Sequence, residues 1–194
     1  MEDILSRPYT REEFAEIRAH VQEPYQRALA AAINQARNRF GAAIVLSLHT
    51  FPLNRPGRLN TGRYAGAYVL GEEMARGSLK ERTGLPDLIM ISNGGLAAAP
   101  RVLEVIRSNF EDRGYKVEDG EGPLKGDHGT TAMYGRPREG VHVVGMEFVP
   151  HGIEIGRAKG RLDLDQEGAE RTSGIFHMTF NRLSQLKPEE INEQ

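Results

Sequence analysis

The 194-residue chain contains no cysteine. Disulfide bonds, thiolate metal sites and a cysteine nucleophile are therefore excluded, and any metal ion would have to be held by histidine, aspartate or glutamate. A chain of this length also needs no covalent cross-link or metal to fold, because it buries roughly 70% of the surface that it exposes when unfolded. The sequence predicts a single domain over residues 1–194.

The chain also lacks a large excess of charge of one sign, and it lacks long apolar runs. Lys and Arg number 25 against 27 Asp and Glu, for a formal net charge of -2, with no long basic run that could track a phosphate backbone. No stretch approaches the roughly 20 apolar residues that cross a membrane, and Met1–Thr10 lacks the features of a secretion signal. We expect a soluble cytoplasmic protein that binds neither nucleic acid nor membranes.

Helical and strand patterns alternate along the chain. Thr10 and Glu13 have the spacing of a capping box, and apolar residues then recur at helical intervals up to Phe40, with Gly41 as the stop. Strands are predicted over residues 43–48, 88–91, 115–117 and 141–148, helices over 102–110 and 169–186, and irregular segments over 52–86 and 120–140. Because strand–helix–strand units build parallel sheets, this order predicts an α/β fold.

His49 is the first candidate for chemistry. It ends the apolar run Ile44–Leu48 just before Pro52, so it is expected at the carboxyl end of a buried strand. In open α/β sheets these strand ends face the ligand crevice, where a ring nitrogen can reach a metal ion or a substrate.

Glu147 is the second candidate, near the end of the strand over residues 141–148. Burial among apolar neighbours would raise the pKa of its carboxyl group toward that of a general base. The alternative is a structural ion pair with one of the arginines. If Glu147 and His49 face one crevice, they have the arrangement of metal-assisted hydrolysis, in which histidine holds the cation and a carboxylate takes a proton from water.

The remaining histidines do not complete a recognisable metal motif. Catalytic zinc generally has three protein ligands, and the chain contains no HExxH spacing. His128 and His151 lie in loops and are weaker candidates, while His20 and His177 are expected at the surface or in packing. His142 is expected on the opposite face of its strand from Glu147, because five residues separate them.

Four stretches of the chain have a recognisable pattern, namely Glu23–Leu29, Leu48–Pro52, Leu124–Pro137 and Gly140–Glu147. In these stretches the chain resembles the N-formylglutamate amidohydrolase family, whose members are zinc-dependent hydrolases. The resemblance runs from about Tyr9 to Phe148. It implies a three-layer α/β/α fold with a mostly parallel mixed sheet, related to the fold of the zinc carboxypeptidases.

The resemblance also implies roles for individual residues. His49 matches a histidine that binds the single zinc ion, and Glu147 matches the glutamate that activates water. Substrate contacts would come from the loop that contains Gly126, Tyr134 and Arg136, with Arg136 as the partner of a carboxylate. The family's N-terminal segment, which carries further metal ligands, is expected to be absent from this chain.

These implications lead to one main hypothesis and two alternatives. The main hypothesis is a zinc-dependent amidohydrolase that cleaves a linear amide in a small N-acyl amino acid such as N-formylglutamate. One alternative is a shortened, non-catalytic family member that acts as a binding or subunit-interaction protein. The other is that a second copy or a separate partner chain supplies the absent ligands.

Overall fold

The structure is a computed structural model that describes residues 9–50, 86–120, 129–148, 155–158, 161–164 and 166–192. Its elements in chain order are α1 (Arg11–Ile17), the π-helix η1 (Arg18–Gln22), α2 (Glu23–Phe40), β1 (Ala43–Thr50), β2 (Leu88–Ile91), α4 (Pro100–Glu111), β3 (Val117–Asp119), α5 (Thr130–Tyr134), the 3-10 helix η4 (Pro137–Glu139), β4 (Val141–Phe148), β5 (Ile155–Ala158), β6 (Arg161–Leu164), α6 (Gln166–Leu183) and α7 (Pro188–Asn192).

The central sheet has four strands in the order β1-β4-β2-β3. Strand β1 is parallel to β4 and β2 is parallel to β3, whereas β2 and β4 run in opposite directions. The sheet is therefore mixed with mostly parallel pairs, as expected. Its two parallel pairs point in opposite directions, so the carboxyl ends of β1 and β4 lie beside the amino end of β2.

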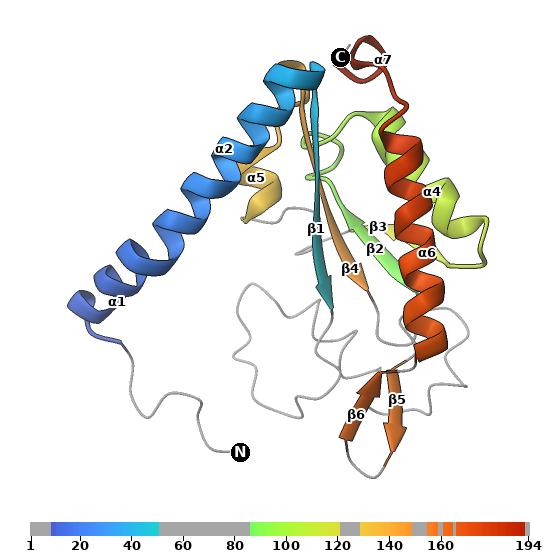
Figure 1. The fold of residues 1–194 in the computed structure, drawn as a ribbon, viewed down its shortest axis with the longest axis horizontal. Helices are drawn as coiled ribbons and strands as arrows, with labels where there is room; N and C mark the ends of the chain where they lie inside the picture. The colour runs from blue at the N-terminus through green and yellow to red at the C-terminus, as the bar shows by residue number, and fades with distance from the viewer. Residues whose placement is uncertain are drawn as a thin grey trace.

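Helices cover both faces of this sheet, which gives the predicted three layers (Figure 1). Helices α4 and α6 cover one face, where Val144, Met146 and Phe148 of β4 join Phe110 of α4 and Ile175 of α6 in the main core. On the other face α2 packs through Ile33 onto a smaller cluster at the amino ends of β1 and β4. This cluster contains the strand residues Ala43, Val45, Val141 and Val143.

Local sequence signals explain where several elements begin and end. The hydroxyl of Thr10 accepts from the backbone N–H of Glu13, whose carboxylate accepts from the N–H of Thr10, so the predicted capping box forms. Gly41 ends α2 with a φ of 81°, a left-handed conformation that glycine adopts without strain. The predicted strands 88–91 and 141–148 have the predicted bounds.

Other elements differ from the sequence prediction. The third strand is Val117–Asp119 rather than 115–117, because the N–H of Tyr115 donates to the carbonyl of Phe110 and closes the end of α4. The last long helix is Gln166–Leu183 rather than 169–186, and tight turns follow it. The glycine-rich segment 120–140 contains the short helices α5 and η4. Residues 52–85 of the predicted irregular excursion lie outside the described residues.

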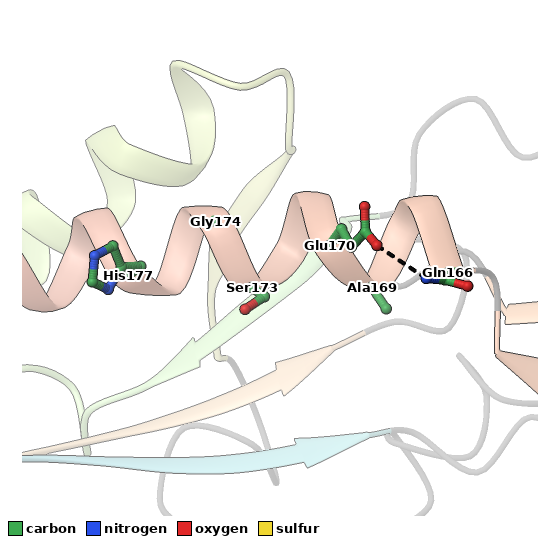
Figure 2. Close-up of a pocket in the computed structure, with 6 residues that line it drawn as sticks. All are labelled: Gln166, Ala169, Glu170, Ser173, Gly174 and His177. Atoms are coloured by element: carbon green, nitrogen blue, oxygen red, sulfur yellow. Dashed lines mark hydrogen bonds between the residues drawn. The ribbon is translucent and has the colours of Figure 1, made fainter.

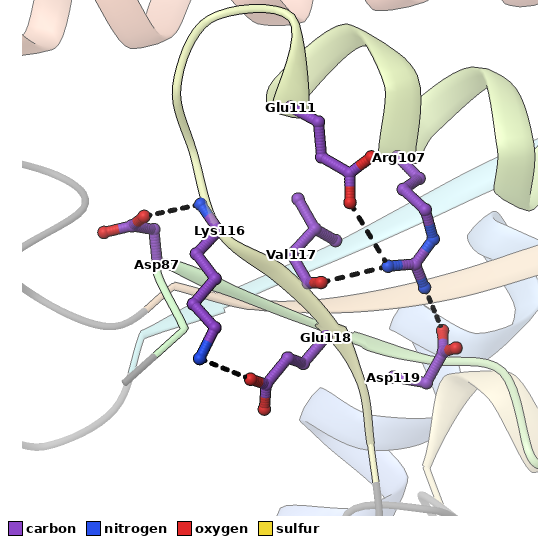
Figure 3. Close-up of polar contacts among 7 residues, drawn as sticks. All are labelled: Asp87, Arg107, Glu111, Lys116, Val117, Glu118 and Asp119. Carbon is purple, nitrogen blue, oxygen red and sulfur yellow. Dashed lines mark hydrogen bonds and ion pairs between the residues drawn. The ribbon is translucent and has the colours of Figure 1, made fainter. Parts of the chain in front are cut away.

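A polar cluster fixes β3, which is the edge strand beside β2 among the described strands (Figure 3). The guanidinium of Arg107 on α4 donates to the Val117 carbonyl at 3.0 Å and to the Asp119 carboxylate at 2.7 Å. The Lys116 ammonium lies 2.8 Å from a carboxylate oxygen of Glu118. The contacts of Arg107 hold β3 against α4. Charged side chains on an edge strand also discourage pairing with another sheet.

Candidate active site

The candidate site lies where β1 and β4 end. The two strands pair in register along their whole length, with Ser47 opposite Gly145 and His49 opposite Glu147. Directly paired residues of neighbouring strands place their side chains on the same face of the sheet. The structure therefore brings His49 and Glu147 side by side at the carboxyl ends of two parallel strands.

Both residues lie on the face that α2 covers, but beyond the part that α2 reaches. At the amino end of this face, apolar residues of β1 and β4 pack against Ile33 of α2. Helix α2 leans away from the sheet toward its own amino end (Figure 1). The same face consequently changes from apolar and covered to polar and accessible: His49 is exposed and Glu147 is half-buried.

Ser47 adds a third polar group to this face. Its hydroxyl lies 3.0 Å from Nε2 of His49, a hydrogen-bonding distance. Residues two apart on a strand share a face, so this contact could have been found from the spacing of Ser47 and His49. Ser47 was not among the predicted site residues.

The described residues do not by themselves form a zinc site. His49 and Glu147 supply one ring nitrogen and one carboxylate, both of which are ordinary zinc ligands. In the part of the chain that the structure describes, no group of three or more histidine, cysteine, aspartate or glutamate residues could hold a metal ion. A catalytic zinc site generally uses three protein ligands, so these two donors are too few.

The other described histidines lie elsewhere. His142 is fully buried on the opposite face from Glu147, as predicted, where its Nδ1 accepts from the N–H of Ala99 at 3.2 Å. Burial lowers the pKa of His142, and its hydrogen bond to Asn192 acts weakly against that shift. His20 and His177 are exposed on helices, while His128 and His151 lie outside the described residues.

Arg136 and Tyr134 are not brought to Glu147. Arg136 forms an isolated bridge with Val141, at the amino end of β4, six residues or roughly 20 Å along the strand from Glu147. Its guanidinium donates to the carbonyls of Ala132 and Gly135 at 3.2 and 2.6 Å. The expectation that Arg136 lies beside the crevice is therefore not supported, because the residue turns the chain into β4 at the far end of the sheet.

Tyr134 serves to attach α5 to α2 in this structure. It is half-buried against the cluster under α2, and its hydroxyl donates to the carbonyl of Gln26 at 3.3 Å. Gly126, the third residue assigned to substrate binding, lies outside the described residues. The roles of all three in substrate binding stay predictions.

The family of the chain follows from comparison with known proteins. Residues 1–153 match the model of the family described as N-formylglutamate amidohydrolase. The chain belongs to this family. That match spans most of the chain and includes both His49 and Glu147. No curated protein matches the sequence.

One solved structure has a fold similar to that of this chain. It is the N-formylglutamate amidohydrolase of Ralstonia eutropha JMP134, with a TM-score of 0.64, 21% sequence identity, and coverage of 96% of this chain and 58% of that chain. At this identity the likeness confirms the fold. The present member of the N-formylglutamate amidohydrolase family thus spans little more than half of the length of that relative.

A surface hollow in this N-formylglutamate amidohydrolase family member lies away from His49 and Glu147. It runs along one side of α6 and is lined by Gln166, Ala169, Glu170, Ser173, Gly174 and His177 (Figure 2). Helix α6 covers the opposite face of the sheet from the one that carries His49. Its polar groups therefore cannot contribute to chemistry at the ends of β1 and β4.

Proposed function

We propose that the chain is an amidohydrolase that cleaves the amide bond of a small N-acyl amino acid such as N-formylglutamate. The observation that carries this proposal is the pairing of His49 with Glu147 at the carboxyl ends of β1 and β4. Membership of the N-formylglutamate amidohydrolase family supports the choice of substrate class. Strand ends of α/β sheets are also where such proteins bind their ligands.

Glu147 acts as the general base in this proposal. Its carboxylate takes a proton from a water molecule, the water oxygen bonds to the amide carbon, and the carbon–nitrogen bond breaks. The proton then passes to the departing nitrogen, so that the products are a carboxylic acid and an amine. Glu147 is half-buried, so part of its side-chain surface stays accessible to water.

We also propose one zinc ion as the cofactor, with His49 among its ligands. Bound zinc would polarise the amide carbonyl and lower the pKa of a water molecule. His49 would contribute a ring nitrogen, and Ser47 would hold the imidazole in one orientation through the contact to Nε2. Elemental analysis of the purified full chain should find about one zinc per chain, and the content should fall sharply in His49→Ala.

Glu147→Gln tests the catalytic role. The substitution keeps the size of the side chain and removes its ability to accept a proton, so N-formylglutamate hydrolysis should fall by a factor of about 100 or more. Release of formate and of the free amine would be followed together. Glu139→Gln, an exposed position on η4 at the other end of the sheet, is the matched control and should keep the wild-type rate. An unchanged rate in Glu147→Gln would contradict the mechanism.

The proposed role of Arg136 is tested separately. If its guanidinium binds the carboxylate of the substrate, Arg136→Ala should raise KM with little change in kcat. A variant with unchanged KM would instead leave Arg136 with the structural contacts to Ala132 and Gly135. The cytoplasmic location expected from the sequence also stays a prediction, which cell fractionation would test.

A second candidate function is binding without catalysis. The observation that favours it is the lack of three metal donors in one group among the described residues. In this case the purified chain would contain no zinc and would not hydrolyse N-formylglutamate, but it would still bind the intact compound in calorimetry. Zinc and activity that appear only in an assembly would indicate that a partner chain completes the site.

A further inference from the structure

The outer edge of strand β1 carries backbone groups that the rest of the described fold does not use. Among the described strands, β1 ends the sheet on one side and β3 ends it on the other. Figure 1 looks onto the first of these edges, with β1 at the front of the sheet between α2 and α6.

Three residues of β1 direct their backbone N–H and C=O groups away from β4. Successive residues of a strand point these groups to opposite edges. The N–H of Ala43 donates to the carbonyl of Gly140, the residue before β4, at 2.8 Å. Ile44, Leu46 and Leu48 consequently point theirs to the outer edge. Within the described part of the chain, no hydrogen bond to these six groups is found, and we call them the open edge.

The open edge lacks the devices that keep the edges of sheets apart. Natural proteins protect an exposed edge with charged side chains, with proline or with a bulge. The opposite edge follows this rule, since β3 carries Glu118 and Asp119 beside Lys116. Strand β1 has the sequence AIVLSLHT, without lysine, arginine, acidic residues or proline, and it pairs with β4 over its whole length without a bulge. Such a strand is typical of one that pairs on both sides.

The side chains of β1 are covered only in part. Val143 and Val144 of β4 are fully buried, whereas the residues paired with them in β1, Val45 and Leu46, are half-buried. Leu48 is 52% exposed on the face that α4 and α6 cover. An uncharged strand beside β1 would cover these side chains and satisfy the open edge at the same time.

We infer that this strand is β1 of a second copy, paired antiparallel about a two-fold axis beside Leu46. Leu46 then faces Leu46 of the other copy, and Ile44 of each copy faces Leu48 of the other. Each of these three pairs exchanges two N–H···O bonds, so all six groups of both open edges are satisfied. A two-fold interface requires a self-complementary patch, and β1 supplies every donor, acceptor and apolar side chain that it needs from a partner.

The helix layers have room for this arrangement. A two-fold axis perpendicular to the sheet keeps each face on its own side, so α2 lies beside α2 of the second copy. Helix α2 packs on residues of both β1 and β4, which places it about one strand spacing from the axis. The two helices are then roughly 10 Å apart, an ordinary packing distance. Since β1 carries no Lys, Arg, Asp or Glu, no such charges meet within the paired strands.

Two substitutions of one residue test the pairing. Light scattering of the purified full chain should give twice the chain mass for the wild type, with dissociation on dilution. Leu46→Pro removes the central outward N–H and leaves the bonds to β4, which come from the residues on either side, so it should have the monomer mass. Leu46→Val keeps the N–H at a similar side-chain size, and it is the matched control that should stay dimeric. Circular dichroism checks that both variants keep the fold.

Amide hydrogen exchange of the wild type gives a readout that depends on no variant. The N–H groups of Ile44, Leu46 and Leu48 should exchange roughly tenfold or more slowly at high protein concentration than after dilution. Those of Val45 and Ser47, which point toward β4, should be slow at both concentrations. Protection of alternate residues that depends on concentration is specific to pairing along the open edge.

A wild type that is monomeric at high concentration, or a dimer that survives Leu46→Pro, would overturn the proposal. Slow exchange of the three outward N–H groups at every concentration would also overturn it, because a segment of the same chain would then pair with β1. A different polypeptide bound to the purified chain, and released by Leu46→Pro, would assign the open edge to that partner instead of a second copy.

Discussion

Gly135 shows how closely single residues are packed around the short helix α5. Its backbone angles are ordinary, so a side chain there would meet only a steric barrier. An added Cβ would lie 2.6 Å from Cβ of Ala97 and 2.7 Å from the carbonyl oxygen of Thr131. Both neighbours are held in place, the first in a buried loop and the second in the backbone of α5.

Gly135→Ala should therefore lower the free energy of unfolding by about 1–3 kcal/mol, as overpacking does in closely packed interiors. Urea unfolding of the two proteins measures the difference. Gly174→Ala is the matched control, because nothing lies within 4 Å of its added Cβ on α6. Alanine there should stabilise the exposed helix by up to about 1 kcal/mol. Equal effects at the two glycines would contradict the steric explanation.

The candidate site could be predicted at the residue scale only in part. The position of His49 beside Glu147 followed from two local patterns, since His49 ends one apolar run with strand-like composition and Glu147 lies near the end of another. The role of Arg136 was taken from the resemblance. The predicted strand 141–148 begins five residues after Arg136, so the turn into this strand lies at its amino end, where the backbone of Arg136 bridges Val141.

At the scale of elements, the packing of α4 against α6 depends on one buried polar pair. The side-chain amide of Asn109 donates to the hydroxyl of Thr179 at 3.1 Å, and that hydroxyl donates to the carbonyl of Ile175 at 2.8 Å. Both side chains are fully buried. Within the described residues, Oδ1 of Asn109 has no hydrogen-bond partner, so one buried acceptor of this pair lacks a hydrogen bond.

Thr179→Val should destabilise the protein by about 1–3 kcal/mol, because it leaves the buried amide of Asn109 without its acceptor. Replacing both partners in Asn109→Leu/Thr179→Val removes the polar groups together and should cost less than Thr179→Val alone. Thermal unfolding of the three proteins tests this order. A double variant that loses the sum of the two single effects would show that the residues do not act as a pair.

Elements were predicted well where their signals are local. The capping box at Thr10, the glycine stop at Gly41 and the apolar run of β4 all act within a few residues of one another. The hairpin of β5 and β6, the helix α7 and the π-helical turn were not predicted. Helix α7 is short and exists through tertiary contacts, with Ile191 buried in the main core. Five residues carry too little periodicity to be recognised without that core.

At the scale of the whole molecule, the two ends of β1 and β4 differ in the residues that they carry. The carboxyl ends of β1 and β4 carry His49 and Glu147, whereas polar contacts close the amino ends. There, Nε2 of His142 bonds with Oδ1 of Asn192 at 3.2 Å, and the amide of Asn192 donates to the Gly41 carbonyl at 3.2 Å. These contacts join β4, α7 and the end of α2. No helix in the described part of the chain is long and apolar enough to cross a membrane.

The direction of β2 could not be predicted from the sequence. A strand–helix–strand unit specifies that β2 and β3 are parallel, which the structure confirms. It does not specify how that unit pairs with β4, and here the pair is antiparallel. Register and direction between distant segments depend on which faces are buried together, and that information is spread over the whole core.

His142 should make the stability of the molecule depend on pH below its ordinary pKa of 6.5. Its Nδ1 accepts a hydrogen bond from Ala99, so the folded protein holds the neutral ring, and burial lowers the pKa of His142. As the pH falls below about 6.5, the unfolded chain binds a proton that the folded chain resists. Stability is thus fully present above that pH and decreases below it, by at most about 1.4 kcal/mol per pH unit.

Urea unfolding from pH 8 to pH 5 measures this dependence. Below pH 6.5 the free energy of unfolding should fall more steeply for the wild type than for His142→Gln, because the glutamine side chain does not titrate. At pH 8 the variant should be the less stable protein, because it disturbs the contacts with Ala99 and Asn192. Parallel curves for the two proteins would show that His142 exchanges its proton equally in the folded and unfolded chains. The steeper wild-type curve would instead show that closure of this end of the sheet requires a neutral imidazole.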